Sequence, residues 1–411
     1  MKILFTHPIG NANVRAILNG LNDEGYLDSF YTSLATYPNN IWDFLSRFKG
    51  LSEFNRRNYN PTLQKFTYTF PYKELGRMFA LKTGLSGFTK HETGIFSVDE
   101  VFKYASYKAS LDLHNKTNLT AVYAYEDGAL ELFIEAKKNG LSCIYDLPIA
   151  YWETGRKLML EESERLPSWA VTLAGGIKDS KKKLERKTKE LELADFVIVP
   201  SLFVKDSLPE NKKASPTILA PFGSPSIFSS LNTTKKQNKL RVLFAGSMGQ
   251  RKGLGDLFQA VKLLNNSNIE LVIMGSPIAS MEFYRKQYQN FTYEPPRPHS
   301  EVLALMRTCD IFCLPSIVEG RALVMQEAMS QGLPLIITPN SGGEDLIIEG
   351  ETGFLVPIRK PDLIAEKLLW FLNNKNHLEY MSECSKKQAA KYTWKKYTQT
   401  VITGIESLLV K

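Results

Sequence analysis

The sequence predicts an α/β protein built from two doubly wound, parallel-sheet domains. In both halves of the chain, short apolar strands alternate with segments of helical spacing. That alternation is the pattern of a parallel sheet covered by helices. The chain has 411 residues, a length that suits two or three domains, each with a buried core of its own.

The expected strands are four-to-five-residue apolar runs, each followed by Gly, Pro or Ser and then by a helical pattern. In the first half they are Ile3–Thr6, Ala121–Tyr125, Ser142–Tyr145 and Phe196–Val199. In the second half they are Arg241–Ala245, Glu270–Met274, Ile311–Leu314, Leu335–Thr338 and Gly353–Val356.

Strand regularity stops after Pro221 and resumes at Leu240, which places the domain boundary in the polar stretch between them. We therefore expect an N-terminal domain at 1–222, a linker at 223–239 and a C-terminal domain at 240–391. Residues 41–120 are helix-rich, aromatic and basic, and we expect an insertion beside the first sheet there. Residues 392–411 have helical spacing with no strand after them.

Composition excludes several classes of protein. No apolar run approaches the roughly 20 residues that span a bilayer, and the first apolar run is too short for a signal peptide. The four cysteines are scattered, which argues against structural zinc or disulfides and favours a cytoplasmic location. The net charge of +8 suits an acidic partner. Without zinc-finger spacing, an RNP signature or a long arginine-rich arm, we expect no nucleic acid.

The most informative stretch is residues 314–334, LPSIVEGRALVMQEAMSQGLP. The expected strand ends at Leu314, a Pro-Ser turn follows, and a helix is expected from about Ala322 to Ser330. Its first-turn amides have no intrahelical partners and carry the positive end of the helix dipole, so they form a site for a diphosphate. These amides belong to Ala322, Leu323 and Val324.

Two carboxylates flank this helix tip. Glu319 stands just before it, and Glu327 lies one turn beyond Leu323 on the same face. Carboxylates bind sugar hydroxyls as charge-assisted acceptors, so one could hold a donor hexose and the other a ribose. The alternative is a capped helix whose Glu residues face solvent. The flanking Pro-Ser, Gly320 and Gly-Leu-Pro favour the binding site.

The second motif is residues 243–254, LFAGSMGQRKGL, where a strand enters a Gly-rich turn. Gly246 and Gly249 allow an anion to approach closely, and Arg251 and Lys252 supply positive charge. A surface basic pair in a tight turn is the alternative interpretation.

Together these stretches resemble the family-4 glycosyltransferases of the GT-B fold, whose Glu-x7-Glu signature usually begins Pro-Ser-x3-Glu-Gly. The resemblance covers most of residues 190–400 and, more loosely, the N-terminal half. It implies two Rossmann-like domains facing a cleft, with Glu319 on the donor-sugar hydroxyls, Glu327 on the ribose and the helix-tip amides on the phosphates. Arg321-Ala322 replaces the aromatic residue and Gly that are frequent in the family, a difference that bears on the choice of donor sugar.

The Gly-rich turn resembles the family's Gly-Arg-x-x-x-Lys-Gly phosphate loop. Lys252 matches the family Lys, but Ser247 occupies the usual Arg position, and we expect Arg251 to compensate. The backbone near Tyr293 and Pro295 lies where the family's nucleobase loop falls, although an ordinary proline-rich loop is the alternative. Residues 392–394 resemble the start of a helix that returns to the N-terminal domain.

On the N-terminal side, the resemblance implies that the loop after Ile3–Thr6 faces the cleft, with Gly10 and Asn11 as candidates, while His7 is interpreted as structural. A second loop carries Tyr125, Glu126 and Asp127 where many relatives have His. This loop could supply a general base, or Asp127 could cap the next helix. Asp146, which follows the next strand, could likewise be a general base or a helix cap.

The expected function is a retaining, metal-independent transfer of a sugar from a nucleotide diphosphate sugar to a glycan, lipid-linked or small-molecule hydroxyl. Retention follows from the resemblance alone. No Asp-x-Asp pair occurs, so Arg251 and Lys252 are expected to stabilise the departing diphosphate without a metal or cofactor. A degenerate nucleotide-sugar-binding protein and a nucleotide-sugar epimerase are the alternatives.

Two basic, apolar-rich segments, 42–57 and 178–189, could lie on an anionic membrane if the acceptor is lipid-linked. The alternative for the first is a packed aromatic helix, and for the second a solvated charged helix.

Overall fold

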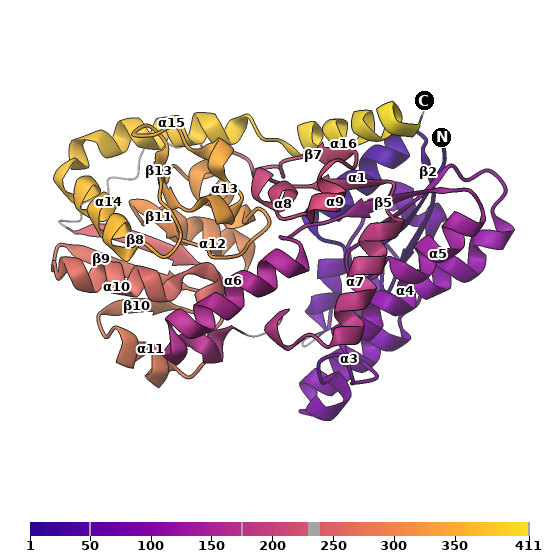
Figure 1. The fold of residues 1–411 in the computed structure, drawn as a ribbon, viewed down its shortest axis with the longest axis horizontal. Coiled ribbons are helices and arrows are strands. Elements are labelled where there is room, and N and C mark those ends of the chain that lie inside the picture. Colours follow the sequence, from indigo (N-terminus) through magenta and orange to yellow (C-terminus); the bar gives the residue numbers. More distant parts are fainter. Residues whose placement is uncertain (49–50, 174–175, 229–238, 410–411) are drawn as a thin grey trace.

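The computed structural model describes residues 1–48, 51–173, 176–228 and 239–409. Figure 1 shows two halves side by side, the N-terminal half in indigo to magenta and the C-terminal half in orange to yellow. Residues 229–238, most of the expected linker, lie outside the described part. None of the described helices is long and apolar enough to cross a bilayer.

The N-terminal sheet has seven strands in the order β3-β2-β1-β4-β5-β6-β7, and every pairing is parallel. Its strands are β1 Ile3–Thr6, β2 Leu27–Thr32, β3 Thr67–Thr69, β4 Ala121–Tyr125, β5 Ser142–Asp146, β6 Phe196–Val199 and β7 Thr217–Leu219. Its helices are α1 Ala12–Asp23, α2 Ile41–Ser46, α3 Tyr72–Lys82, α4 Val98–Asp112, α5 Leu130–Lys138, α6 Trp152–Arg165, α7 Lys181–Leu193, α8 Leu202–Asp206 and α9 Glu210–Lys213.

The C-terminal sheet has six strands in the order β10-β9-β8-β11-β12-β13, again all parallel. Its strands are β8 Leu240–Ala245, β9 Ile269–Met274, β10 Phe291–Glu294, β11 Ile311–Leu314, β12 Leu335–Ile337 and β13 Gly353–Leu355. Its helices are α10 Leu254–Leu264, α11 Met281–Gln287, α12 His299–Met306, α13 Leu323–Ser330, α14 Pro361–Asn373 and α15 Leu378–Ala390, followed by α16 Trp394–Leu409.

All nine expected strands are present, within one residue at each end, because each is a largely buried apolar run between helices. Four further strands do not stand out from loops in the sequence: β2, β3 and β10 contain many polar residues, and β7 has only three residues. The expected insertion at 41–120 is helix-rich, yet it is not wholly separate from the sheet. It contributes the edge strand β3, and α4 packs Ala109 against the sheet core.

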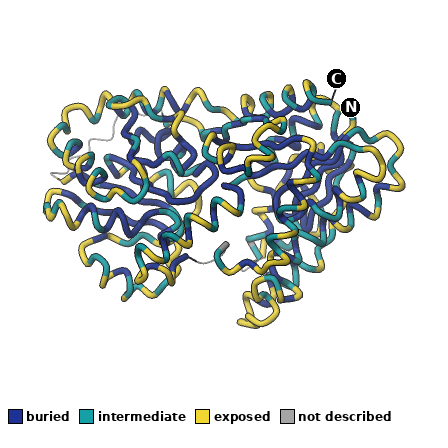
Figure 2. The backbone as a smooth tube through the Cα atoms, in the orientation of Figure 1, coloured by how far each residue is buried: buried dark blue, intermediate teal, exposed yellow. Residues whose placement is uncertain are grey.

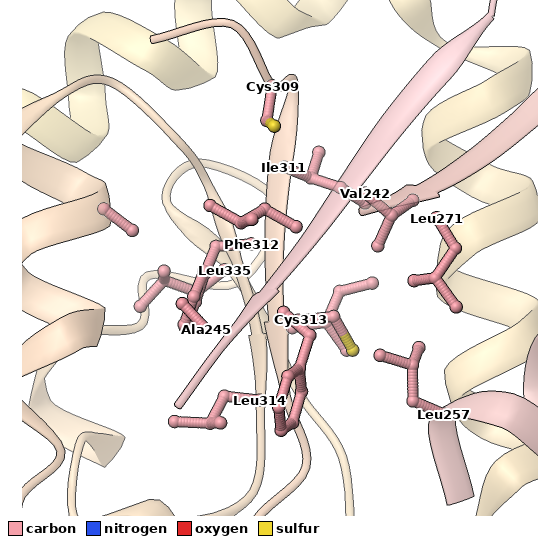
Figure 3. Close-up of a cluster of buried hydrophobic side chains, with 14 of the residues drawn as sticks. Val242, Ala245, Leu257, Leu271, Cys309, Ile311, Phe312, Cys313, Leu314 and Leu335 are labelled. Atoms are coloured by element: carbon pink, nitrogen blue, oxygen red, sulfur yellow. The ribbon is translucent and has the colours of Figure 1, made fainter. Parts of the chain in front are cut away.

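Each domain has its own core between its sheet and helices. The strands are the dark, buried part of the tube in Figure 2. Figure 3 shows the C-terminal core, where Val242 and Leu271 of adjacent strands face Leu257 of α10, while Phe312 lies on the other side of the sheet. Cys309 and Cys313 are buried within this packing and take part in no disulfide.

Two helices connect the domains. Figure 1 shows α16 lying along the top of the N-terminal half, after α15 on the C-terminal half, and Thr398 of α16 donates to the Ala16 carbonyl of α1 at 3.2 Å. The second helix, α6, follows β5 in the chain but ends on the C-terminal domain, with Arg165 donating to Asp256 of α10. Trp169 just beyond it joins the C-terminal core. Residues 152–172 therefore bridge both domains.

Candidate functional site

A cavity of about 910 Å³ lies between the two domains. Its walls are loops at the carboxyl ends of parallel strands from both sheets, the edge at which doubly wound folds bind ligands. It is lined by twelve of the residues that the sequence predicts, namely Asn11, Tyr125, Glu126, Asp127, Gly246, Ser247, Lys252, Glu319, Ala322, Leu323, Val324 and Glu327.

Five predicted residues do not line it: Gly10, Arg251, Tyr293, Pro295 and Gly320. Gly10 lies under the ring of Tyr59, too close for a β-carbon. Tyr293 lies in strand β10 and its hydroxyl donates to the Gly275 carbonyl at 3.2 Å. Pro296 and Arg297, which follow in the chain, line the cavity where Tyr293 and Pro295 do not.

The tip of α13 opens on this cavity. Ala322 is the N-cap residue, and no side chain caps the helix. The Ala322 amide donates to the Ser341 carbonyl at 3.2 Å, so the sequence-based expectation of a free amide at this residue is wrong. The first-turn amides of Leu323 and Val324 have no carbonyl partner within the helix and keep the geometry of an anion site.

Glu319 joins the two motifs. Its Oε1 accepts from the Lys252 ammonium and, at 2.8 Å, from the Arg251 guanidinium. The side chains are largely buried, with 11% of Glu319 and 13% of Lys252 exposed. Burial alone would raise the pKa of Glu319, but the two cations bring it below its ordinary value. Burial lowers the pKa of Lys252.

Arg251 and Lys252 point to different places. Lys252 lines the large cavity, whereas Arg251 also donates to the Val318 carbonyl at 2.9 Å and lines a smaller neighbouring cavity. Ser247 lines the large cavity, and Arg251 does not. Gly246, at φ +144°, leaves room for the Lys252 stem, since a β-carbon there would lie 2.8 Å from Lys252 Cδ.

Gly320 seats the Glu319 loop on the N-terminal domain. The Ser201 hydroxyl donates to the Gly320 carbonyl at 2.6 Å, and a β-carbon on Gly320 would lie 1.7 Å from the Pro148 carbonyl oxygen. Only glycine fits this approach between two backbones.

We expect Gly320→Ala to lower the free energy of unfolding by about 1–3 kcal/mol, because the backbones must separate. The Glu319 carboxylate would also shift, so catalytic activity should fall. Thermal unfolding measures the loss of stability. Gly87→Ala is the control, since a β-carbon at Gly87 meets nothing within 4 Å. Equal unfolding midpoints for the two variants would contradict the close approach.

Glu327 faces the cavity from the first turns of α13, with 20% of its side chain exposed. Burial raises its pKa, while His299 opposes the rise; His299 Nε2 lies 3.1 Å from Glu327 Oε1. Sequence analysis missed His299 and Arg297, which also line the cavity. Arg297 lies in the loop after β10 and His299 is the first residue of α12. Because β10 does not stand out in the sequence, their place at this sheet edge gave no local signal.

The opposite wall is the loop after β4. Glu126 is buried in it, 3.4 Å from the Lys187 ammonium of α7, and burial raises the pKa of its carboxyl. The proposed helix cap by Asp127 is wrong, because Glu190 of α7 accepts from the amides of Asp127 and Ala129. Asp127 instead pairs with Arg186 at 2.6 Å.

His7 and Asp146 are both buried. Burial lowers the pKa of His7 to about 3, so its ring is neutral, and its Nδ1 accepts from the Ile9 amide. Asp146 accepts from the Tyr123 hydroxyl at 2.5 Å and does not line the large cavity. Neither the base nor the cap suggested for Asp146 fits this position.

Burial raises the pKa of Asp146 from 3.8 to about 7. The folded state therefore binds this proton more tightly than the unfolded state. We expect the contribution of Asp146 to the free energy of unfolding to fall as pH rises from about 4 to about 7, by about 1.4 kcal/mol per unit at most. The free energy of unfolding, measured by urea denaturation at several pH values in this range, should change less steeply with pH for Asp146→Asn than for the unsubstituted protein. The same dependence on pH in both proteins would contradict the raised pKa of Asp146.

Among the described residues, one group could hold a metal: His91, Glu92 and Asp179, whose ligand atoms lie within 4.8 Å of one another. Glu92 already accepts from the Ser180 amide, and Asp179 pairs with Lys183 at 3.3 Å. Both carboxylates therefore have partners within the protein, so their closeness does not require a bound ion.

Comparisons with known proteins agree with this geometry. Residues 228–388 match the family described as Glycosyl transferases group 1. An uncharacterised glycosyltransferase of Methanocaldococcus jannaschii is 26% identical over 220 residues, 52% of this chain and 60% of that protein. The D-inositol 3-phosphate glycosyltransferase of Corynebacterium glutamicum is 31% identical over 166 residues, 37% of this chain and 40% of that one. The chain thus matches less than two thirds of the length of either relative.

The structure of HepE from Anabaena in complex with UDP has the same fold. It superposes on this chain with a TM-score of 0.63 at 14% identity, covering 99% of this chain and 100% of HepE. The predicted fold class, two Rossmann-like domains in the GT-B arrangement, is confirmed, and so is the family resemblance.

Proposed function

Since residues 228–388 form a group 1 glycosyltransferase domain on a GT-B fold, we propose that the protein transfers a sugar from a nucleotide diphosphate sugar to an acceptor hydroxyl. The proposal adds retention of the anomeric configuration and independence from metals. The proposed sugar transfer rests chiefly on one observation: the cavity between the domains brings the α13 tip, Lys252 and Glu319 to one wall and Glu126 to another.

On the donor side, the diphosphate binds to the amides of Leu323 and Val324 and to Lys252. The ribose binds to Glu327 after displacing His299, and the donor sugar binds to Glu319. HepE was solved with UDP, so uridine is the first base to test. The ion pair between Lys252 and Glu319 must loosen as the diphosphate enters, because one ammonium then serves two anions.

The transfer step breaks the bond between the anomeric carbon and the β-phosphate oxygen, and its electron pair leaves with the diphosphate. The acceptor oxygen forms the new bond to the same carbon, and its proton passes to the Glu126 carboxylate. Lys252 and the helix amides stabilise the charge that develops on the leaving group, which is the role a metal has in other transferases. The raised pKa of Glu126 suits a proton acceptor.

The location that accompanies this proposal is the cytoplasm, with peripheral membrane contact if the acceptor is lipid-linked. Phe44 and Phe48 are about half exposed beside the exposed Arg47, which supports the first basic segment as the contact. The second segment is less suited, because Lys183, Arg186 and Lys187 face carboxylates of the N-terminal domain.

A degenerate protein that binds the nucleotide sugar without turnover is the second candidate. Ser247 favours it, since this residue supplies no cation at the cavity wall where the family has Arg.

Thermal shift and calorimetry with UDP-, GDP- and ADP-sugars test the proposal, followed by nucleotide release in the presence of EDTA. We expect one base to bind, release to persist in EDTA, and the product to keep the donor's anomeric configuration by NMR. Binding without release under any condition would favour the degenerate protein. Binding of none of these sugars would exclude both.

A further inference from the structure

A second cavity, of about 280 Å³, adjoins the first. The two share Glu126 and Asp127 in their walls. A molecule held in the small cavity would therefore reach the large one past the loop that carries Glu126.

The small cavity has walls from three parts of the fold. His91 and Lys183 belong to the N-terminal domain, Trp152 and Gly155 to the first turn of α6, and Arg251 to the C-terminal domain. The cavity thus exists only where both domains meet, which is also where the large cavity lies.

The α6 wall is fixed at both ends. Near its start, Trp152 Nε1 donates to the Thr188 hydroxyl at 3.2 Å, which orients the indole. Near its end, Glu162 accepts from Gln250 at 2.8 Å and from the Arg359 guanidinium. A wall held by buried polar contacts on both domains is a preorganised surface for a ligand.

The charges around this cavity are matched. Lys183 lies 3.3 Å from Asp179, Lys187 lies 3.4 Å from Glu126, and Arg251 donates to Glu319. A fourth cation in the wall, Arg156, donates to the Asp179 carbonyl at 3.4 Å. A free anion such as phosphate would also meet the three carboxylates of this wall, and an apolar chain would displace the water that solvates its charged groups. A neutral molecule rich in hydroxyls can both donate to the carboxylates and accept from the ammonium groups.

Trp152 and Met159 give the same cavity an apolar side. Mixed polar groups opposite a flat aromatic ring fit a sugar ring, which has hydroxyls at its edge and C–H groups on its face. We propose that the small cavity binds the acceptor as a neutral saccharide, with its ring on Trp152 and one hydroxyl directed past Glu126 to the donor sugar. This inference rests on the proposed function and names the acceptor class for it.

Gly155 offers a steric test. A β-carbon there makes only ordinary contacts, 3.7 Å from Val318 Cγ1 and 3.8 Å from the Ala150 carbonyl, so a larger side chain extends into the cavity without disturbing the backbone. The probes are glucose, galactose, mannose and N-acetylglucosamine, added to the protein with the nucleotide sugar that binds it. At least one should accelerate nucleotide release.

We expect Gly155→Leu to raise the KM for that saccharide at least tenfold, while calorimetry gives a donor affinity within about twofold of the original. Gly87→Leu is the matched control, since the same side chain there meets open space. If Gly155→Leu does not fold, Trp152→Leu removes the ring face and should raise the same KM.

The two proposals fail differently. If no nucleotide sugar binds, the proposed function is wrong. If one binds and is hydrolysed, but no saccharide accelerates release, or the KM is unchanged in these variants, the saccharide cavity is wrong.

Discussion

Replacing Lys252 by alanine should lower kcat for sugar transfer by about 100- to 1,000-fold, the cost of removing one preorganised donor where charge develops. The ammonium lines the donor cavity and is largely buried, so water does not screen it well. Donor affinity should fall less than kcat, because the leaving diphosphate gains negative charge only as the bond breaks. Steady-state kinetics with calorimetry of the nucleoside diphosphate separate the two effects.

Lys262→Ala is the matched control, because Lys262 is exposed on α10 and lines neither of the two cavities at the domain junction. Its kcat should equal that of the unsubstituted protein. A Lys252→Ala protein with unchanged kcat would remove the basis for metal-independent leaving-group stabilisation.

Replacing Glu319 by glutamine should have opposite effects on binding and on turnover. Two cations lose their shared counter-charge, so the free energy of unfolding should fall by about 3 kcal/mol. This is the lower end for a buried pair, because 29% of the Arg251 side chain is exposed. Affinity for the nucleoside diphosphate should rise, since Lys252 no longer has a competing carboxylate, and sugar transfer should fall.

Urea unfolding, calorimetry and a transfer assay measure these three quantities on one preparation. Added nucleoside diphosphate should restore more stability to Glu319→Gln than to the original protein, because its phosphates replace the lost anion. Glu210→Gln is the control, with 87% of that side chain exposed. A weaker diphosphate affinity in Glu319→Gln would contradict the competition.

Local pattern predicted most of the architecture. Strands such as β1 and β11 are buried on both faces, so their apolar runs stand out from the flanking turns. Edge and near-edge strands such as β3 and β10 are partly exposed and more polar, and their pairing depends on neighbours distant in sequence. This is why the residue pair Tyr293-Glu294 resembles a loop in the sequence and forms the end of a strand in the fold.

The donor motifs could be predicted because their chemistry is local. Glu319, Glu327 and the α13 tip lie within a few residues of one another, and a helix start has the same amide geometry in any protein. The direction of a side chain is not local. Arg251 and Lys252 are adjacent in sequence and both donate to Glu319, but Lys252 lines the large cavity, whereas Arg251 donates to the Val318 carbonyl and lines the smaller one.

The basic segment at 178–189 gives a second example. In the sequence, without its partners from other elements, the number of lysines indicates a solvated or membrane-facing helix. In the fold, Lys183 and Lys187 face Asp99 and Glu126 from two other elements, because the free energy of a buried charge depends on the partner that meets it.

The sequence by itself determined the two parallel-sheet domains, most of the residues that line the large cavity among those it predicted, and the family resemblance, since periodicity and short motifs act within one or two elements. Only the tertiary structure decided that α6 bridges the domains, that Gly320 lies against Pro148, and that a second cavity adjoins Glu126. These features depend on contacts between segments far apart in the chain, whose distances are set by how the two domains pack and not by the spacing of residues along either segment.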